Sequence, residues 1–380
     1  MSTLKVYGIR SNSASSDAIT LASDGTCTAN ITNNLSNRNV IVNGGCLVAQ
    51  RGVSSTSSDY GSVDRMKMSV TNTDELAFAQ KQTSDGPDGF SKCFEFDVTT
   101  AESALAADEL VYMRYLVEAQ DLRPFYNANG TGKNFTLSFY VKAAQTGTYN
   151  IGIHKADNTT RFITTTYTIS QADTWQRVVW NITGDTGTSG INADNGQGFQ
   201  ISFMLAAGTN FTSGGVQSSW GGFSNSLMAG GHAVNVVSST DNYWRITGIQ
   251  LEVGSVATDF EHRSYGDELA KCQRYYFKFC EGTNKEINVC WYFSNTHISF
   301  FVRYPTTMRA APTLTTVGGT NYYIFYRNGS NDQFDNFASE YISTEQMSCY
   351  QNSGVSGTAG QAGILRTNNA SAKVEVSAEL

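Results

Sequence analysis

The sequence has few charged residues and no cluster of basic ones. Charged side chains make up 16% of the 380 residues, and the formal net charge is −7. No run of Lys and Arg is present that would neutralise a series of phosphate groups. We therefore expect no binding to nucleic acid.

Long apolar runs are also missing. A membrane-spanning helix needs roughly 18 apolar residues in succession, and no window of the sequence approaches this length. The opening residues, MSTLKVYGIRSN, contain no apolar core of a secretory signal. We expect synthesis in the cytosol and no insertion into a membrane.

Histidine and cysteine are too sparse to form a metal or redox motif. The four histidines stand singly, and the seven cysteines include no CxxC pair. We predict buried free thiols and no cofactor. A structural calcium ion is an open alternative, because Asp185, Asp194 and Asp241 lie in expected loops, although no complete calcium-loop pattern is present.

The abundant residue types favour strands and turns. The chain has 35 glycines and 12% aromatic residues, with much Ser, Thr and Asn. Apolar and polar residues alternate most clearly at 135–141, 149–153, 175–182, 199–205 and 244–251. We predict an all-β protein with a jelly-roll β-sandwich, a second, smaller C-terminal β-sandwich domain and a short N-terminal β arm.

Turn signals and local composition divide the chain into three parts. The predicted parts are an N-terminal arm at 1–38, the jelly-roll at 39–265 and the C-terminal domain at 266–380. In the arm, Asp24-Gly25 predicts the turn of a hairpin. Helix-forming residues predict two exceptions to the β pattern, a short helix or a helical turn within 101–120 and a helical linker at 266–274.

Several separated segments resemble one group of proteins. They are MSTLKV at 1–6, SDGT at 23–26, NRNVIVNG at 37–44, VAQRG at 48–52, residues 244–276, and PTTMRAAP at 305–312. The group comprises tail-fibre and related structural proteins of bacteriophages, many of them marine. The most specific segment is 244–276, WRITGIQLEVGSVATDFEHRSYGDELAKCQRYY. Two departures are Cys46, where Met is common, and Met66, where an aromatic residue usually follows Asp64-Arg65.

This resemblance implies a virion structural protein, a subunit of a tail fibre or spike that attaches the phage to a host surface polysaccharide. It implies a homotrimer whose residues 1–38 dock onto other tail or virion proteins, and a sugar-binding jelly-roll. The resemblance brings no enzymatic reaction. The protein is expected in the virion after synthesis in the host cytoplasm.

Aromatic side chains are the candidate glycan contacts, because aromatic faces stack on the C–H groups of sugar rings. The candidates are Trp220 and Phe223 in a Gly-Ser loop and Trp291, Tyr322, Tyr323 and Tyr326 in the last domain. The alternative for Trp220 is packing on a neighbouring subunit. Periodic strands contain Trp175, Trp180 and Trp244, which we expect in the core.

Two other functions stay open. One is an architectural role, as a capsid decoration or head fibre that recognises no host. The other is a polysaccharide depolymerase, which would need a pair of carboxylates from a set such as Asp88, Glu95, Asp97, Glu252, Asp259 and Glu261. No repeat period of the kind seen in β-helical tailspikes is evident, so we predict no catalytic residues.

Overall fold

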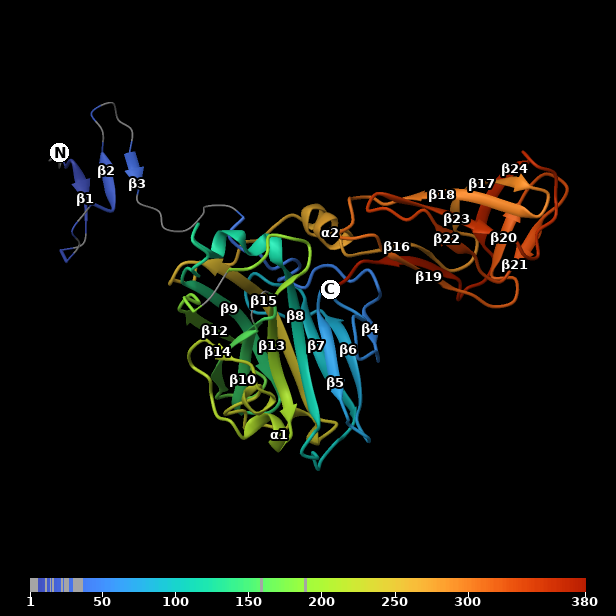
Figure 1. Cartoon of the computed structure of the whole chain (residues 1–380). Helices are drawn as coiled ribbons and strands as arrows, with labels where there is room; N and C mark the ends of the chain where they lie inside the picture. The colour runs from blue at the N-terminus through green and yellow to red at the C-terminus, as the bar shows by residue number, and fades with distance from the viewer. Residues whose placement is uncertain are drawn as a thin grey trace.

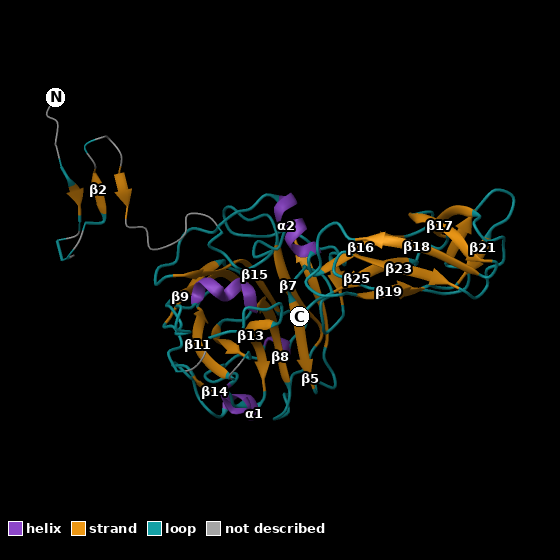
Figure 2. Ribbon diagram, turned by 45° about the horizontal axis from the view of Figure 1, so that its top comes forward, coloured by secondary structure: helices purple, strands orange, loops and turns teal. Residues whose placement is uncertain are grey.

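Strands dominate the computed structural model of the chain (Figure 1). It describes residues 6–10, 12, 13, 15, 17–21, 23, 27–29, 37–157, 160–187 and 190–380. The helices are short (Figure 2): η1 (Ala119–Phe125), α1 (Thr209–Thr212), η2 (Asn225–Leu227), η3 (Val236–Ser238) and α2 (Tyr265–Gln273). Within the described ranges, no helix is long and apolar enough to cross a membrane. The predicted all-β class is confirmed.

Two six-stranded antiparallel sheets form a β-sandwich. The first has the order β14 (Gly221–Gly222), β11 (Arg161–Ile169), β10 (Gly147–Lys155), β13 (Gln197–Ala207), β8 (Leu110–Glu118) and β5 (Lys67–Thr71). The second has the order β12 (Gln176–Ile182), β9 (Phe135–Ala143), β15 (Tyr243–Val253), β7 (Cys93–Thr100), β6 (Ala77–Thr83) and β4 (Ser54–Ser55). Strand β14 is an edge of the first sheet and strand β12 is an edge of the second. These two edges lie on the same side of the sandwich.

The core lies between the two sheets. Phe139 on β9 and Phe203 on β13 meet edge to face, with ring centroids 5.1 Å apart. Trp244 on β15 is fully buried beside Phe203, which confirms its predicted place in the core. Although β9 and β10 follow each other in sequence, they pair with strands of different sheets, so the turn between them crosses the sandwich.

Of the short helix or helical turn predicted within 101–120, the helix is absent and a single turn is present, in which the backbone N–H of Glu109 donates to the carbonyl oxygen of Ala106 at 3.3 Å. Residues 101–109 contain no helix, β8 follows, and only the 3-10 helix η1 begins at Ala119. The reason is that β8 is a central strand buried on both faces. Its inward side chains join the main core, while Tyr112 packs with Met204 and Phe162 on the other face. Burial of both faces outweighs the local helix propensity.

Helix α2 leads into the C-terminal sheets and confirms the predicted helical linker. Ser264 caps it, because its hydroxyl accepts a hydrogen bond from the backbone N–H of Asp267 at 3.2 Å. A three-stranded sheet follows, with the order β16 (Tyr276–Glu281), β25 (Lys373–Ser377) and β19 (Thr313–Val317). It shares a core with a seven-stranded sheet.

The seven-stranded sheet extends away from the sandwich (Figure 1). Its order is β21 (Asp332–Phe334), β20 (Tyr323–Tyr326), β24 (Ala362–Thr367), β17 (Glu286–Ser294), β18 (His297–Arg303), β23 (Gln346–Gln351) and β22 (Ala338–Glu340). Its neighbouring strands pair antiparallel throughout the described residues. The second sandwich of the fold prediction is therefore present.

A small antiparallel sheet near the N-terminus contains β1 (Gly8–Ile9), β2 (Ile19–Leu21) and β3 (Cys27–Ala29). The pairing of β2 with β3 agrees with the predicted hairpin. Its turn residues, Asp24 and Gly25, lie outside the described residues.

The thiols behave as the sequence predicts, as far as they are described. Six cysteines are free, and five of these are buried. Burial raises the pKa of Cys46, of Cys290 and of Cys349 to about 12 in each case, so these thiols stay protonated at neutral pH. The side chain of Cys27 lies outside the described part.

Candidate functional site

A cleft of about 380 Å³ opens where the edges of the two sandwich sheets meet. We call it the edge cleft. Strand β12 forms one wall and β11 the other, and the loops 183–187 and 218–220 close its ends. Edge strands leave space between the sheets because no further strand pairs with them, so this is a natural position for a binding site on a sandwich.

Two tryptophans from opposite sheet edges line the edge cleft. Trp180 points inward from β12, and Trp220 ends the loop that leads into β14. Both indoles are half-buried and pack partly on the sandwich core. The indole N–H of Trp220 donates to the carbonyl oxygen of Thr183 at 2.8 Å, which joins the two loops. The Trp220 ring is thus held in place before any ligand binds.

A buried ionic network supports the floor of the edge cleft. The Asp185 carboxylate accepts hydrogen bonds from Lys155 Nζ at 2.9 Å, Arg161 Nη2 at 3.0 Å and the backbone N–H of Gly187 at 3.0 Å. Burial alone would raise the pKa of Asp185, but these three donors hold it below its ordinary value. The carboxylate is therefore ionised and fully engaged in holding the loop.

Arg161 connects this network to the second loop. Its Nη2 also donates to the backbone carbonyl oxygen of Trp220 at 3.0 Å. The side chain of Arg161 is 22% exposed, whereas those of Lys155 and Asp185 are 0% and 1% exposed. Arg161 is therefore the member of the network that reaches the cleft surface.

The rim of the edge cleft offers polar groups. Thr186, Ser218 and Ser219 are exposed in its lining, and their hydroxyls make no hydrogen bond to another described residue. Asp185 is the one carboxylate in the lining, and it is already paired. Hydrolysis of a glycoside uses two carboxylates, so the edge cleft has the groups to bind a sugar but not that catalytic pair.

The structure separates the two candidates of the Gly-Ser loop. Trp220 lines the edge cleft, but Phe223 lies outside it. The Phe223 ring stacks on His154, with centroids 4.7 Å apart, and meets Phe162 edge to face. Phe223 remains 36% exposed, but it does not line the edge cleft.

The C-terminal candidates have three different positions. Trp291 and Tyr326 lie on the outer face of the seven-stranded sheet. Tyr322 is half-buried against the C-terminal core. Tyr323 is fully buried, and its hydroxyl donates toward the carbonyl oxygens of Val317 and Lys373 at 2.8 and 2.9 Å. A glycan has no access to this ring, so the prediction of Tyr323 as a ligand contact is wrong.

The calcium alternative gains no support from its named residues. Asp185 is paired with cations, as described above, and Asp194 accepts a bond from the backbone N–H of Gly196 at 2.8 Å. In the described part of the chain, one group of three acidic side chains has ligand oxygens within 4.8 Å of one another. That group is Asp74, Glu102 and Glu109, and it includes none of the predicted ligands.

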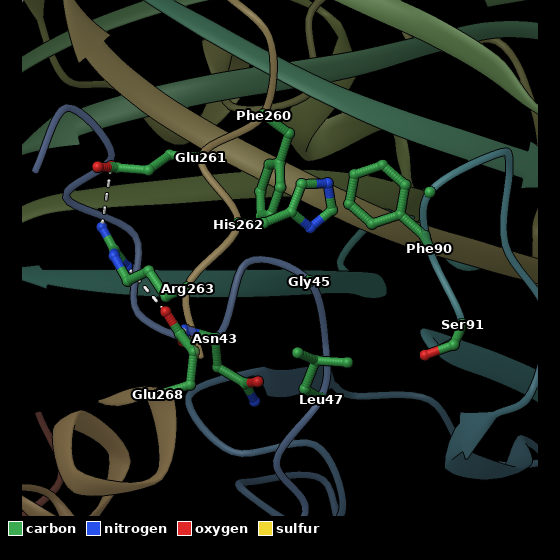
Figure 3. A pocket seen from close by; sticks show the side chains of 11 residues that line it. Asn43, Gly45, Leu47, Phe90, Ser91, Phe260, Glu261, His262, Arg263 and Glu268 are labelled. Atoms are coloured by element: carbon green, nitrogen blue, oxygen red, sulfur yellow. Dashed lines mark hydrogen bonds and ion pairs between the residues drawn. The ribbon is translucent and has the colours of Figure 1, made fainter. Parts of the chain in front are cut away.

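A second cavity, of about 210 Å³, lies between the sandwich and α2 (Figure 3). Phe90, Phe260 and His262 form its aromatic wall, with the centroids of Phe90 and Phe260 5.0 Å apart. Opposite them, Arg263 donates to Glu268 at 2.9 Å. Arg263 also donates to the carbonyl oxygen of Ile41 at 3.1 Å. Glu268 of α2 accepts from the backbone N–H of Asn43 at 2.5 Å, so both members of the pair tie the helix to residues 41–43.

Comparison with known proteins identifies no family. No protein-family model and no curated protein matches the sequence. Among solved structures, the enzymatically active domain of tailspike protein 4 from bacteriophage CBA120 is similar in fold, at 14% identity and a TM-score of 0.31. The match covers 57% of this chain and 21% of that chain, so this chain spans about a fifth of the tailspike structure.

Carbohydrate-binding modules are similar in the same way. A family 11 module from Clostridium thermocellum, solved with a β-1,3-1,4-mixed-linked tetrasaccharide, is 10% identical with a TM-score of 0.28, covering 54% of this chain and 98% of that module. A module solved with β-1,4-galactotriose has the same identity and TM-score, covering 57% and 100%. These values transfer no ligand, activity or partner to this chain.

Sequence reasoning missed most of the edge cleft. It placed Trp180 in the core and treated Asp185 as a loop carboxylate, and it did not single out Arg161 or the serines. Trp180 and Trp220 are 40 positions apart and meet only because two sheet edges coincide. One usable signal was the position of Asp185 directly after a strand that ends in Trp180-Asn181-Ile182.

Proposed function

We propose that this chain binds a host cell-surface glycan in the edge cleft, as a virion structural subunit of a phage tail fibre or spike. The observation that carries the proposal is the pair of half-buried indoles, Trp180 and Trp220, held facing one cleft beside hydroxyls that have no described partner. Indole faces stack on sugar C–H groups, and free hydroxyls exchange hydrogen bonds with sugar hydroxyls. The cleft supplies both.

Assembly completes the proposed function. Residues 1–38 dock the subunit onto the virion, residues 39–265 bind the glycan, residues 266–380 form the last domain, and the working unit is a homotrimer. The sequence resemblance to phage fibre proteins supports this arrangement. A stacked ring contributes about 0.5–1.5 kcal/mol beyond the burial of area. Several weak sites on one particle then give firm attachment through multivalency.

The test is binding of the purified full-length chain to a broad glycan array, with Trp220→Ala as the variant. The matched control is Trp175→Ala. Trp175 is also a half-buried indole whose N–H is hydrogen-bonded, to Asp85 Oδ1 at 3.2 Å, but it lies outside the edge cleft. Trp220→Phe keeps a ring on the core and guards against a loss of binding that comes only from unfolding.

We expect saturable binding that Trp220→Ala reduces at least tenfold and Trp175→Ala leaves unchanged, with melting temperatures showing that both variants fold. No binding by a correctly assembled oligomer would contradict the proposal and favour an architectural capsid or head-fibre role. Release of reducing ends from the bound polysaccharide would instead show a depolymerase.

A further inference from the structure

Six large apolar side chains stand on the outer face of the seven-stranded sheet, uncovered by any described part of the chain. We call this surface the apolar sheet face. It comprises Val289, Trp291 and Phe293 on β17, Phe301 on β18, Tyr326 on β20 and Ile364 on β24. Phe293 is 73% exposed and Val289 59% exposed, and Trp291 is half-buried.

The strand register makes these side chains one continuous surface. Tyr326 lies opposite Ile364, and Ile364 lies opposite Val289, so three neighbouring strands contribute to one row. Trp291 lies opposite Ser299 of the next strand, and its ring centroid is 5.6 Å from that of Phe301. Residues opposite each other in antiparallel pairs are close enough to touch.

The composition of the apolar sheet face fits a protein partner rather than a sugar. Four of its members, Val289, Phe293, Phe301 and Ile364, have no hydrogen-bonding atom in the side chain. A sugar needs partners for its hydroxyls, whereas the centre of a protein interface is apolar, rich in aromatic residues and poor in charge. The apolar sheet face therefore suits a protein partner, whereas the edge cleft suits a sugar.

The extent of the face is that of an interface core. A whole aromatic side chain offers roughly 150–250 Å², so the six partly exposed side chains present on the order of 500 Å² of apolar area. This is the range of the largest patch on a typical monomer, which is often functional. A standard interface buries about 800 Å² on each partner, so the face with its polar rim matches one such contact.

The distribution of charge favours another copy of this chain as the partner. Each copy carries a formal net charge of −7, so copies repel unless they meet where charges are absent or matched. The centre of the face is uncharged, and charges of both signs surround it. Arg303 and Arg366 are cationic, and Glu286 and Glu340 are anionic, so two copies can bring unlike charges opposite each other. The Arg366 guanidinium lies 4.4 Å from the centre of the Tyr326 ring, so this cation packs on the apolar sheet face itself.

We propose that the apolar sheet face is the surface through which copies of this chain associate. The inference rests on the self-assembly in the proposed function and assigns it to named residues. It is independent of glycan binding, because Trp220 and the edge cleft belong to the other sandwich. If association through the apolar sheet face were disproved, glycan binding in the edge cleft would still stand, and the reverse is also true.

Sedimentation velocity of the full chain at micromolar concentration tests the inference. The variant combines Val289→Lys with Ile364→Lys, and the control is Val179→Lys, which adds a lysine at a 46% exposed strand position of the first sandwich. We expect an oligomer for the wild type and the control, and a monomer for the double variant. Circular dichroism and the melting temperature check that each protein folds.

Two results would overturn the inference: a monomeric wild type over the whole concentration range, or a folded double variant that associates like the wild type. If the double variant does not fold, Phe293→Ser replaces it, because that ring is the most exposed of the face. We expect Phe293→Ser to weaken association at least tenfold, and unchanged association would count against the proposal. Single-site glycan binding by the monomeric variant should equal that of the wild type.

Discussion

The buried guanidinium of Arg65 is ion-paired with the carboxylate of Glu379, which lies 314 positions later in the chain. The Arg65 guanidinium also sits 3.6 Å above the centre of the Tyr275 ring and donates to the carbonyl oxygen of Leu116 at 2.6 Å. Arg51 reaches the same Glu379 carboxylate at 3.2 Å. The last residues of the chain are thereby fastened to the first sandwich.

Three of the segments singled out in the sequence meet at this contact. VAQRG at 48–52 contains Arg51, Asp64-Arg65 supplies the buried cation, and segment 244–276 ends in Arg274-Tyr275-Tyr276. All three meet at the junction between the sandwich and the C-terminal sheets, where Arg274 also pairs with buried Glu118 at 2.6 Å. These segments therefore hold the junction together.

Glu379→Gln should destabilise this junction. The variant leaves the Arg65 guanidinium, 1% exposed, without its counter-charge, and we expect the free energy of unfolding to fall by about 3 kcal/mol. Calorimetry of the full chain measures the effect. The control is Glu281→Gln, which breaks a surface pair with Lys278 whose carboxylate is 52% exposed, at a cost of about 0.5 kcal/mol or less. If Glu379→Gln and Glu281→Gln lowered the free energy of unfolding equally, the stabilising role of the Arg65–Glu379 pair would be contradicted.

Acid should destabilise the first sandwich through His232. Burial lowers the pKa of His232 from 6.5 to about 4, so between these values the unfolded chain binds a proton that the folded chain does not. Stability from this group is complete above pH 6.5 and is lost as the pH falls toward 4, by about 2 kcal/mol between pH 6.5 and 5.

His232→Asn isolates that contribution. Asparagine can accept the hydrogen bond that His232 Nδ1 takes from the backbone N–H of Asn150 at 3.2 Å, but it does not titrate. Urea unfolding at both pH values measures the difference in unfolding free energy between wild type and variant. We expect this difference to change by about 2 kcal/mol between pH 6.5 and pH 5. Asp64, whose pKa burial raises to about 6, acts in the opposite direction in both proteins and cancels in the difference. Parallel pH profiles would refute the role of His232.

Gly248→Ala should disrupt the aromatic wall of the cavity in Figure 3. Gly248 has φ +63°, and an added Cβ would lie 2.8 Å from Phe90 Cζ and 2.9 Å from Tyr140. We expect a loss of about 2–4 kcal/mol from the strained backbone and the overpacking together. Gly329→Ala is the control, since Gly329 has φ +76° and no atom within 4 Å of the added Cβ. It should cost only about 1 kcal/mol, and chemical unfolding compares the two.

Arg161→Met tests the support of the edge cleft without removing a tryptophan. Loss of the bond to the Trp220 carbonyl oxygen frees the 218–220 loop, so we expect roughly tenfold weaker glycan binding, equal to about 1.4 kcal/mol. Asp185 keeps Lys155, and the melting temperature should fall only modestly. Arg177→Met, an exposed arginine on β12, is the control and should bind like the wild type. Normal binding by Arg161→Met would show that the loop does not depend on this contact.

Local patterns predicted those features that depend on neighbours in sequence. Period-two alternation identified the strands that became β9, β10, β12, β13 and β15, and the helix-forming residues of 266–274 identified α2. The same reasoning overstated the helix at 101–120, where helix formers precede a strand that both sheet faces bury. Propensity is a local quantity, whereas burial on two faces depends on strands far away in the chain.

The candidate site was less predictable because strand register decides it. Tyr323 and Tyr326 are three positions apart on one strand, yet the first points into the core and the second is 47% exposed. A guessed register does not tell these faces apart. The edge cleft depends in addition on which strands form sheet edges, and no pattern in the sequence pairs Trp180 with Trp220.

The pairing of β16 with β25 has a mechanical consequence. Tyr276 lies opposite Ser377 and Glu281 opposite Lys373, so the strand that enters the C-terminal sheets and the strand that leaves them run side by side from the junction. Each is fastened at its base, β16 through α2 and β25 through Glu379. A single tether would let the distal sheets swivel, but two anchors resist torsion. The two anchors therefore keep the C-terminal sheets from rotating about the junction, and the apolar sheet face keeps one direction relative to the edge cleft.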